Sequence, residues 1–185
     1  MSSRMTPGGL AILTMTGQAI CHMEVVRMAE EMRVIQYGLG PIGCGVARLA
    51  ASRPGIRLVG GIDIDPAKVG RDLGEVIGLN APLGIPVRDD AAALLAETRP
   101  DVALHCTNSS LERVLPQLEG LIAAGVNVIS TTEELSYPAA QHPQLAERLD
   151  RLAKEHGVAV LGTGINPGFI MDTLPMAVTA VCQSV

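Results

Sequence analysis

Three glycines are spaced so that a short loop between a strand and a helix could hold a phosphate group. The pattern is GxGxxG, and it covers Gly38, Gly40, Pro41, Ile42 and Gly43. Gly38 would permit a tight turn, Gly40 would let a diphosphate approach the backbone because it has no Cβ, and Gly43 would let the helix pack on the strand. The free N–H groups and positive end of that helix attract phosphates. These five residues are therefore predicted to bind the diphosphate of NAD or NADP, the alternative being a purely structural glycine turn.

An acidic residue follows at the distance expected for such a site. Asp63 lies 20 residues after the last glycine and closes the second predicted strand. A carboxylate there would accept hydrogen bonds from the adenine ribose hydroxyls and repel a 2′-phosphate, which favours NAD over NADP. Asp65 is the alternative acid, and Lys68 or Arg71 could still accommodate a phosphate. The competing interpretation of Asp63 is a helix cap beside Pro66.

Small polar residues follow three later predicted strands. In an open parallel sheet, ligands bind beyond the carboxyl ends of the strands, where the strand order reverses. The residues predicted to contact the cofactor from these positions are Thr107, Ser130, Thr131, Thr132 and Asn166. The alternative is that such residues only cap the helices that follow them.

Four further side chains near these segments each have two interpretations. His105 is a candidate proton donor or a histidine whose hydrogen bonds are satisfied inside the fold. Cys44, in the first turn of the predicted helix, is either a thiol with a lowered pKa or a small residue packed under the glycine loop. Glu133 and Glu134 either face a cationic substrate or begin a solvated helix. These residues alone do not assign a catalytic group.

From residue 33 onward, apolar strand-like segments alternate with helical ones. The expected strands are 33–37, 56–63, 101–106, 126–130 and 158–161. The expected longer helices are 41–52, one capped by Asp89 or Asp90 that ends near 98, one capped by Ser109 or Ser110 that ends near 124, and 143–156. A short helix is expected at Pro66, and the following Gly- and Pro-rich stretch is expected to be irregular. This alternation predicts an α/β protein with a doubly wound parallel sheet, a Rossmann fold, of about six strands.

Composition limits the possible partners of the chain. Its 185 residues include 14 basic and 19 acidic ones, for a net charge of −5, and only 2% are aromatic. Nucleic-acid binding is disfavoured because no cluster of cations is present. A membrane span is not expected because no run of about 18 apolar residues occurs. The four scattered cysteines lack metal-ligand spacing, so no metal site is expected and a cytoplasmic location is predicted.

Three parts of the chain are expected to differ in role. Residues 1–31 hold many of the methionines and are expected to form a poorly ordered extension or a short helix. Residues 32–170 are expected to form the NAD(P)-binding domain. Residues 171–185 are expected to start a truncated helix leading to an absent substrate and oligomerisation domain.

Two later motifs carry a family resemblance. They are STTEELSYP at residues 130–138 and GTGINPGFIMDTLP at residues 162–175. Together with the glycine loop, they resemble the N-terminal domain of the 2,4-diaminopentanoate dehydrogenase family, which is similar to dihydrodipicolinate reductase. Thr131, Thr132 and Asn166 match polar positions of that nucleotide domain.

The resemblance implies an NAD(P)-dependent oxidoreductase that acts on the amine-bearing carbon of a diamino acid such as 2,4-diaminopentanoate. It also implies a small-molecule substrate and a homo-oligomer in the full-length family, and it leads us to expect that this chain alone is inactive. The alternatives are a cyclic imine reductase of the dihydrodipicolinate reductase type and a non-catalytic NAD(P)-binding module.

Overall fold

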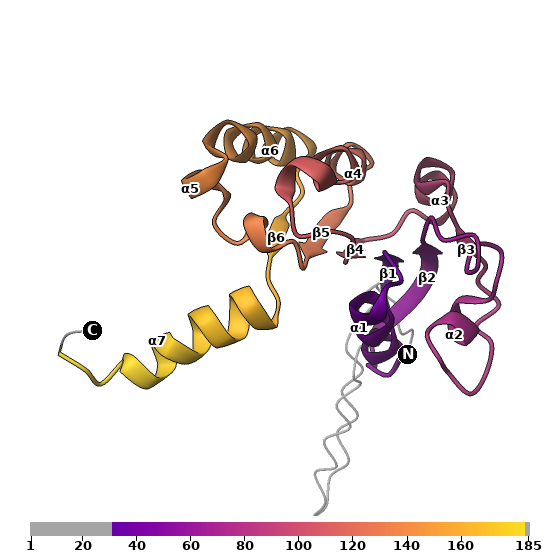
Figure 1. Ribbon diagram of the computed structural model, residues 1–185. Helices are drawn as coiled ribbons and strands as arrows, with labels where there is room; N and C mark the ends of the chain where they lie inside the picture. Colours follow the sequence, from indigo (N-terminus) through magenta and orange to yellow (C-terminus); the bar gives the residue numbers. More distant parts are fainter. Residues whose placement is uncertain (1–30, 184–185) are drawn as a thin grey trace, which may run out of the picture. The chain divides into compact units, whose positions relative to one another are not determined.

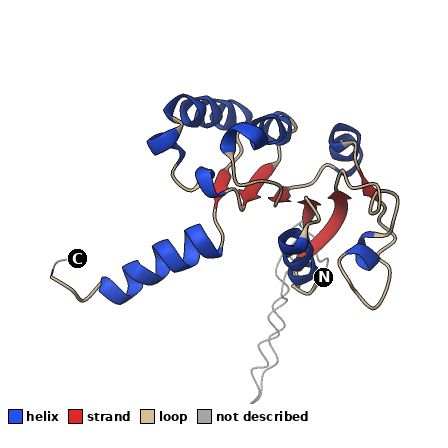
Figure 2. Cartoon of the chain, in the orientation of Figure 1, coloured by secondary structure: helices blue, strands red, loops and turns tan. Residues whose placement is uncertain are grey.

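A parallel sheet of six strands organises the chain (Figures 1 and 2). The computed structural model describes residues 31–183. The strands are β1 (Met32–Tyr37), β2 (Ile56–Ile62), β3 (Val87–Arg88), β4 (Val102–His105), β5 (Asn127–Ser130) and β6 (Val160–Gly162). Their spatial order is β3-β2-β1-β4-β5-β6, and every pair is parallel. The order reverses between β1 and β4, so the switch point lies beside the glycine loop. The predicted fold class is confirmed.

Helices cover both faces of the sheet, which makes the fold doubly wound. On one face, α1 (Pro41–Ala51) and α2 (Leu73–Val76) pack with β1, β2 and β3 around an aliphatic cluster. On the other, α3 (Ala91–Thr98), α4 (Leu111–Ala123) and α6 (Pro143–His156) enclose a second cluster. Figure 1 shows the two sets of helices on opposite sides of the strands. Both clusters are aliphatic, as a chain with so few aromatic residues requires.

Successive side chains of the central strand β1 serve different faces, because a strand alternates with period two. Val34 belongs to the cluster beside α1, whereas Ile35 belongs to the cluster beside α4. By the same alternation Gln36 faces the α1 side and Tyr37 faces the α4 side. Strand β1 therefore buries one polar side chain directly under the start of α1.

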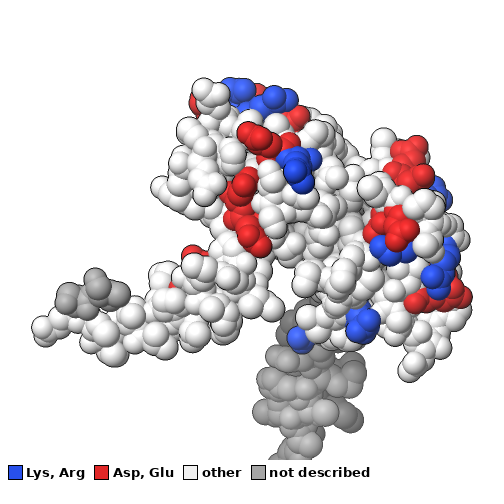
Figure 3. All heavy atoms as spheres, viewed as in Figure 1, with Lys and Arg blue, Asp and Glu red and all other residues white. Residues whose placement is uncertain are grey.

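The chain after β6 is apolar and exposed. It comprises η2 (Ile165–Thr173), a π-helical segment whose backbone is non-helical only at residues 166–168, and the helix α7 (Leu174–Thr179), which continues it. Among its exposed side chains are Phe169, Met171 and Met176. Figure 3 shows this segment almost without charged atoms, and Asp172 is the one charged residue in the sequence from 165 to 179. The helix expected over residues 171–185 ends at Thr179 in the structure, and residues 184 and 185 lie outside the described residues.

Other predictions about local structure need correction. Pro66 begins a run of turns that ends at Gly70 (φ 84°), not a helix. The stretch expected to be irregular contains β3 and α2, and the last strand begins at Val160 rather than at residue 158. Within the described residues, none of the helices combines the length and the apolar character that crossing a membrane would need. The predicted extension at residues 1–31 falls almost entirely outside the described part of the chain.

Candidate functional site

The glycine loop joins β1 to α1 at the switch point of the sheet. Gly38 has a φ of 91°, in the left-handed region that favours glycine. A Cβ on Gly38 would strike the Cys106 carbonyl oxygen and approach Thr107, which follows β4. A Cβ on Gly43 would overlap the Gly38 carbonyl oxygen. Both glycines are therefore needed for the fold itself, because they let the loop, the helix and the end of β4 meet.

Gly40 differs from these two glycines, because an ideal Cβ built on it has no heavy atom within 4 Å. Its backbone is extended (φ −67°, ψ −177°), a conformation that any residue adopts. The fold therefore does not explain why a glycine stands here. Open space in front of a loop backbone is what an approaching diphosphate would require.

The N-terminus of α1 has no capping side chain. Gly40 is the N-cap residue, Pro41 begins the helix, and the first turn holds no acidic residue. Amides of a first helical turn have no preceding carbonyl to bond, so those of Ile42 and Gly43 remain available. The start of α3 differs, because the Asp90 carboxylate accepts a hydrogen bond from the Ala93 N–H there, whereas α6 also begins without a capping side chain but does not follow a glycine loop. The start of α1 is thus left open for an anion from outside the chain.

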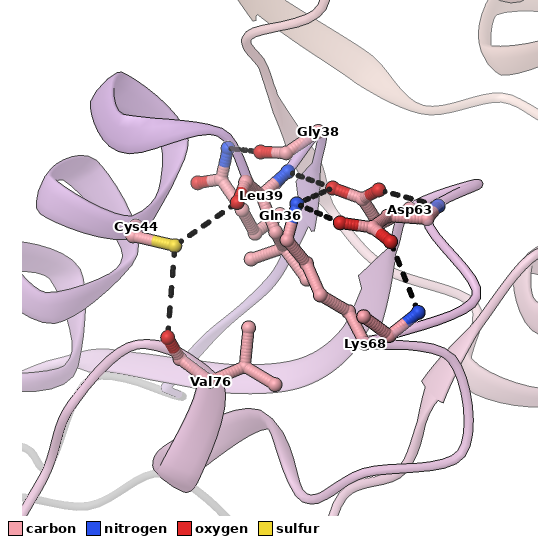
Figure 4. A network of polar contacts seen from close by, with 9 residues as sticks. Gln36, Gly38, Leu39, Cys44, Asp63, Lys68 and Val76 are labelled. Carbon is pink, nitrogen blue, oxygen red and sulfur yellow. Dashed lines mark hydrogen bonds and ion pairs between the residues drawn. The ribbon is translucent and has the colours of Figure 1, made fainter.

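Asp63 faces the glycine loop from the end of β2 (Figure 4). Its Oδ2 accepts a hydrogen bond from the Leu39 N–H at 2.7 Å, and its Oδ1 accepts one from the Asp65 N–H at 2.8 Å. Lys68 Nζ lies 3.3 Å from Asp63 Oδ2 and 3.2 Å from Asp65 Oδ2. Partial burial acts to raise the pKa of Asp63, but the two N–H groups and the Lys68 ammonium outweigh it, so this pKa lies below its ordinary value. The carboxylate is therefore charged and sits at the mouth of the loop.

Cys44 packs beneath the loop. Its thiol donates to the Leu39 carbonyl oxygen at 3.1 Å and also lies near the Val76 carbonyl oxygen (Figure 4). Burial raises the pKa of this thiol, and the positive charges of Lys68 and Arg48 only partly oppose that effect. The packing interpretation is therefore supported, and a lowered thiol pKa is contradicted.

His105 lies wholly buried at the end of β4. Its Nε2 lies 2.8 Å from Gln117 Oε1 and 3.0 Å from the Thr107 hydroxyl oxygen. Its Nδ1 lies 2.9 Å from the Ser130 hydroxyl oxygen, so both ring nitrogens have hydrogen-bond partners inside the protein. Burial lowers the pKa of His105, although the hydrogen bond to Gln117 opposes this, so the ring is neutral. The structure supports a histidine with satisfied hydrogen bonds rather than an exposed proton donor.

The polar residues after β4 and β5 form one hydrogen-bonded group around His105. Ser130 and Thr132 are buried, and the Thr132 hydroxyl donates to the Asn108 carbonyl oxygen at 2.8 Å. Thr107 lies beside Gly38, and its hydroxyl donates to Gln117. The hydroxyls of Ser130 and Thr132 already have partners inside the protein, so contacts from these two residues to a cofactor would have to use the main chain. The structure thus brings Thr107 to the glycine loop and ties it to the end of β5.

Two predicted cofactor residues lie differently. Thr131 is half-buried, and its N–H donates to the His105 carbonyl oxygen at 3.0 Å, which continues the sheet. Asn166 is exposed in η2, the segment that follows β6. Cofactor contact by both residues stays a prediction.

Glu134 caps helix α4, for which the sequence predicts a serine cap. Ser110 occupies the N-cap position of α4 but makes no side-chain capping bond. Instead, Glu134 Oε2 accepts a hydrogen bond from the Leu111 N–H at 2.7 Å and lies 3.1 Å from His142 Nε2. The Leu111 N–H, with a smaller contribution from His142, holds the pKa of the Glu134 carboxyl below its ordinary value. Glu134 thus binds the protein's own helix end, which corrects the predicted serine cap.

Sequence reasoning missed Gln36 and Gln117. Gln36 is fully buried under the loop and donates through Nε2 to the Gly38 carbonyl oxygen at 3.0 Å. An amide in the middle of a strand, between Ile35 and Tyr37, was the available signal for Gln36. Gln117 lies on α4, 12 residues after His105, and helical spacing alone gave no sign of that contact.

The family model for the N-terminus of dihydrodipicolinate reductase matches residues 32–163. The chain belongs to this family. The match begins at the first residue of β1 and runs just past β6, so it covers the whole sheet. The resemblance seen in the sequence is confirmed.

The chain is similar to several named dehydrogenases and reductases. 2,4-Diaminopentanoate dehydrogenase of Acetoanaerobium sticklandii is 39% identical over 167 residues, which is 84% of this chain and 44% of that protein. An amine dehydrogenase of Streptomyces virginiae is 28% identical over 80% of this chain and 41% of its own length. 4-Hydroxy-tetrahydrodipicolinate reductase of a Synechocystis species is 32% identical over 81% of this chain and 52% of its own length. The chain therefore spans about half the length of these relatives, or less, and their names match the expected oxidoreductase class.

Solved structures resemble the same part of the chain. The amine dehydrogenase of Mycobacterium smegmatis superposes with a TM-score of 0.71 at 39% identity, covering 74% of this chain and 40% of that one. GenD2 from gentamicin A biosynthesis, solved in complex with NAD, gives a TM-score of 0.56 at 23% identity, covering 73% of this chain and 35% of that one. The second likeness concerns the fold alone.

Proposed function

We propose that the switch-point edge of this sheet binds NAD or NADP, with the diphosphate on the loop from Gly38 to Gly43. The observation that carries this proposal is the contrast between two helix ends. The start of α4 is neutralised by Glu134, whereas the start of α1 has no acidic partner and has open space in front of Gly40. Among these two ends, an anionic ligand finds free N–H groups only at α1.

The adenosine end of the cofactor lies beside Asp63. Its carboxylate binds the ribose hydroxyls, while Lys68 supplies a positive charge that can meet a 2′-phosphate. Lys68 Nζ lies 3.3 Å from Asp63 Oδ2, so the preference of Asp63 for NAD and the preference of Lys68 for NADP act at the same place. The nicotinamide end lies over the ends of β4 and β5, near Thr107 and Thr131, with Asn166 as a further contact.

The whole enzyme is an amino-acid dehydrogenase that acts on the amine-bearing carbon of a diamino acid such as 2,4-diaminopentanoate. Residues 32–170 form its cofactor domain, and residues 171–185 lead toward its substrate and oligomerisation domain. NAD(P)⁺ would accept the hydride from that carbon, a proton would leave the nitrogen, and the resulting imine would hydrolyse to a ketone. The identity of 39% to 2,4-diaminopentanoate dehydrogenase supports this choice of substrate class. The second candidate is reduction of a cyclic imine, which is supported by the dihydrodipicolinate reductase family match.

Isothermal titration with NADH and with NADPH tests the cofactor step. We expect saturable binding of at least one of them, and no heat with either at millimolar concentration would refute the proposal. Because this chain alone is expected to be inactive, the two reactions are separated with the whole enzyme, by assays of 2,4-diaminopentanoate with NAD(P)⁺ and of a cyclic dihydrodipicolinate-type imine with NAD(P)H. Cofactor binding by this chain without turnover of either substrate by the whole enzyme would favour a non-catalytic cofactor module.

A further inference from the structure

Gln36 is a buried polar residue whose hydrogen bonding is incomplete. It lies on the central strand β1, between β2 and β4, and its side chain is 0% exposed. Its Nε2 donates to the Gly38 carbonyl oxygen, but its Oε1 has no hydrogen-bond partner among the described residues. A buried amide oxygen without a partner destabilises a fold, and an apolar side chain of similar size would avoid that cost. Packing alone therefore does not explain a glutamine here.

The position of the amide links it to the glycine loop. A Cβ on Gly43 would lie 3.0 Å from Gln36 Nε2, so the amide sits between β1 and the first turn of α1. The Gly38 carbonyl can only accept, so the NH₂ group must face it. Figure 4 shows the Gln36 amide beside the Gly38 carbonyl, on the side of α1 and away from the Asp63 carboxylate.

Three contacts orient the Gly38 N–H, the Leu39 N–H and the Gly38 carbonyl. The Gly38 N–H donates to the Ile62 carbonyl oxygen at 2.8 Å, and the Leu39 N–H donates to Asp63. Gln36 supplies the third, because it holds the Gly38 carbonyl toward the interior. A carbonyl that turned outward would present a partial negative charge to a diphosphate, and it would also move the following N–H groups.

We infer that Gln36 is a positioning residue for the cofactor: its amide keeps the Gly38 carbonyl turned inward, so that the diphosphate meets only N–H groups. The inference rests on the proposed function. It assigns a role in cofactor binding to a residue outside the glycine motif. Gln36 would affect binding through the loop backbone, and only for ligands that carry the diphosphate.

The test compares ligands with and without a diphosphate. Gln36→Leu keeps the side-chain volume but removes both the donor and the unpaired oxygen. We expect its melting temperature to equal or exceed that of the wild type. We expect the Kd for ADP-ribose and NADH to rise about tenfold, while the millimolar binding of adenosine, followed by NMR, is unchanged. Val34→Ala is the matched control on the same face of β1, and it should lower the melting temperature without changing the Kd for ADP-ribose.

A second variant keeps the inference testable if Gln36→Leu does not fold. In Gln36→Glu the protonated acid can still donate to the Gly38 carbonyl, whereas the ionised acid repels both that carbonyl and the phosphates. Its affinity for ADP-ribose should therefore fall as pH rises, while that of the wild type stays flat. Unchanged ADP-ribose affinity in a folded Gln36→Leu, or a flat pH profile in Gln36→Glu, would overturn the inference. If the wild type binds neither NADH nor ADP-ribose, the proposed function fails instead.

Discussion

Replacing Gly40 by alanine should separate cofactor binding from folding. The Gly40 backbone has a φ of −67°, which alanine adopts without strain, and no heavy atom lies within 4 Å of the Cβ that would be added. Alanine restricts the unfolded chain, which stabilises by about 0.4–1 kcal/mol, but it is less favourable than glycine at an N-cap, so we expect the stability of Gly40→Ala to stay within about 1 kcal/mol of the wild type. Gly38 and Gly43 offer no such separation, because a Cβ at either position would strike a backbone carbonyl oxygen.

The effect of Gly40→Ala on binding follows from the same open space. If the diphosphate occupies it, the methyl group displaces at least one charge-assisted hydrogen bond, worth about 1.5–3 kcal/mol. That loss corresponds to an increase of roughly 10- to 150-fold in Kd. Isothermal titration with NADH, together with thermal unfolding, measures both quantities.

Gly45→Ala is the matched control for this experiment. Gly45 lies inside α1, and its added Cβ would also have no heavy atom within 4 Å. Alanine there should stabilise the helix by about 0.5–1 kcal/mol and leave the Kd for NADH unchanged. Wild-type affinity in Gly40→Ala would show that the space before this loop is not where the diphosphate binds.

Three further predictions concern charge and pH. Asp63→Asn removes the charge that repels a 2′-phosphate and leaves Lys68 paired with Asp65 alone, so the ratio of NADPH to NADH affinity should rise roughly tenfold. An unchanged ratio by titration would contradict the role of Asp63. Burial lowers the pKa of His105 in the folded state, so as pH falls the histidine is protonated first in the unfolded state. The free energy of unfolding should therefore decrease below about pH 6.5, by at most about 1.4 kcal/mol per pH unit. Urea unfolding at pH 7.5 and 5.5 should therefore show a smaller difference for His105→Gln, and an equal difference would refute this. Asp72→Asn should lower the melting temperature by several degrees, because one carboxylate accepts N–H groups from both α2 and the segment before β3; Asp150→Asn, at an exposed helical position, should have little effect.

The regular elements of this fold follow from local sequence signals. Apolar strands, helix-ending glycines such as Gly125 and Gly157, and the glycine loop place five of the strands and the long helices near their observed bounds. β3 was missed because it has only two residues and lies in a Gly- and Pro-rich stretch. Its neighbourhood is organised by Asp72, which accepts hydrogen bonds from Leu83, Gly84 and Ile85, and such a contact leaves no local pattern.

The sequence predicted those features of the site that depend on backbone geometry. It did not predict the features that depend on which side chains bond to each other. Glycine spacing and the distance to Asp63 indicated which backbone would face a ligand. The cap of α4 could not be found this way, because Glu134 lies 23 residues from Leu111, whereas Ser110 is adjacent and has the expected residue type. Likewise, Ser130 contacts His105 on another strand and donates to Thr132, and residue types alone do not indicate these partners.

The hydrogen-bonded group around His105 has a consequence for how the two ends of a bound dinucleotide would differ. The loops after β4 and β5 are joined through neutral, buried side chains, so they are preorganised and should lose little flexibility when a ligand arrives. At the opposite end, the Lys68 ammonium must leave at least one carboxylate before a ribose or its phosphate can take that place. Structural adaptation to the ligand, and with it the dependence of affinity on ionic strength, should therefore be concentrated at the adenosine end.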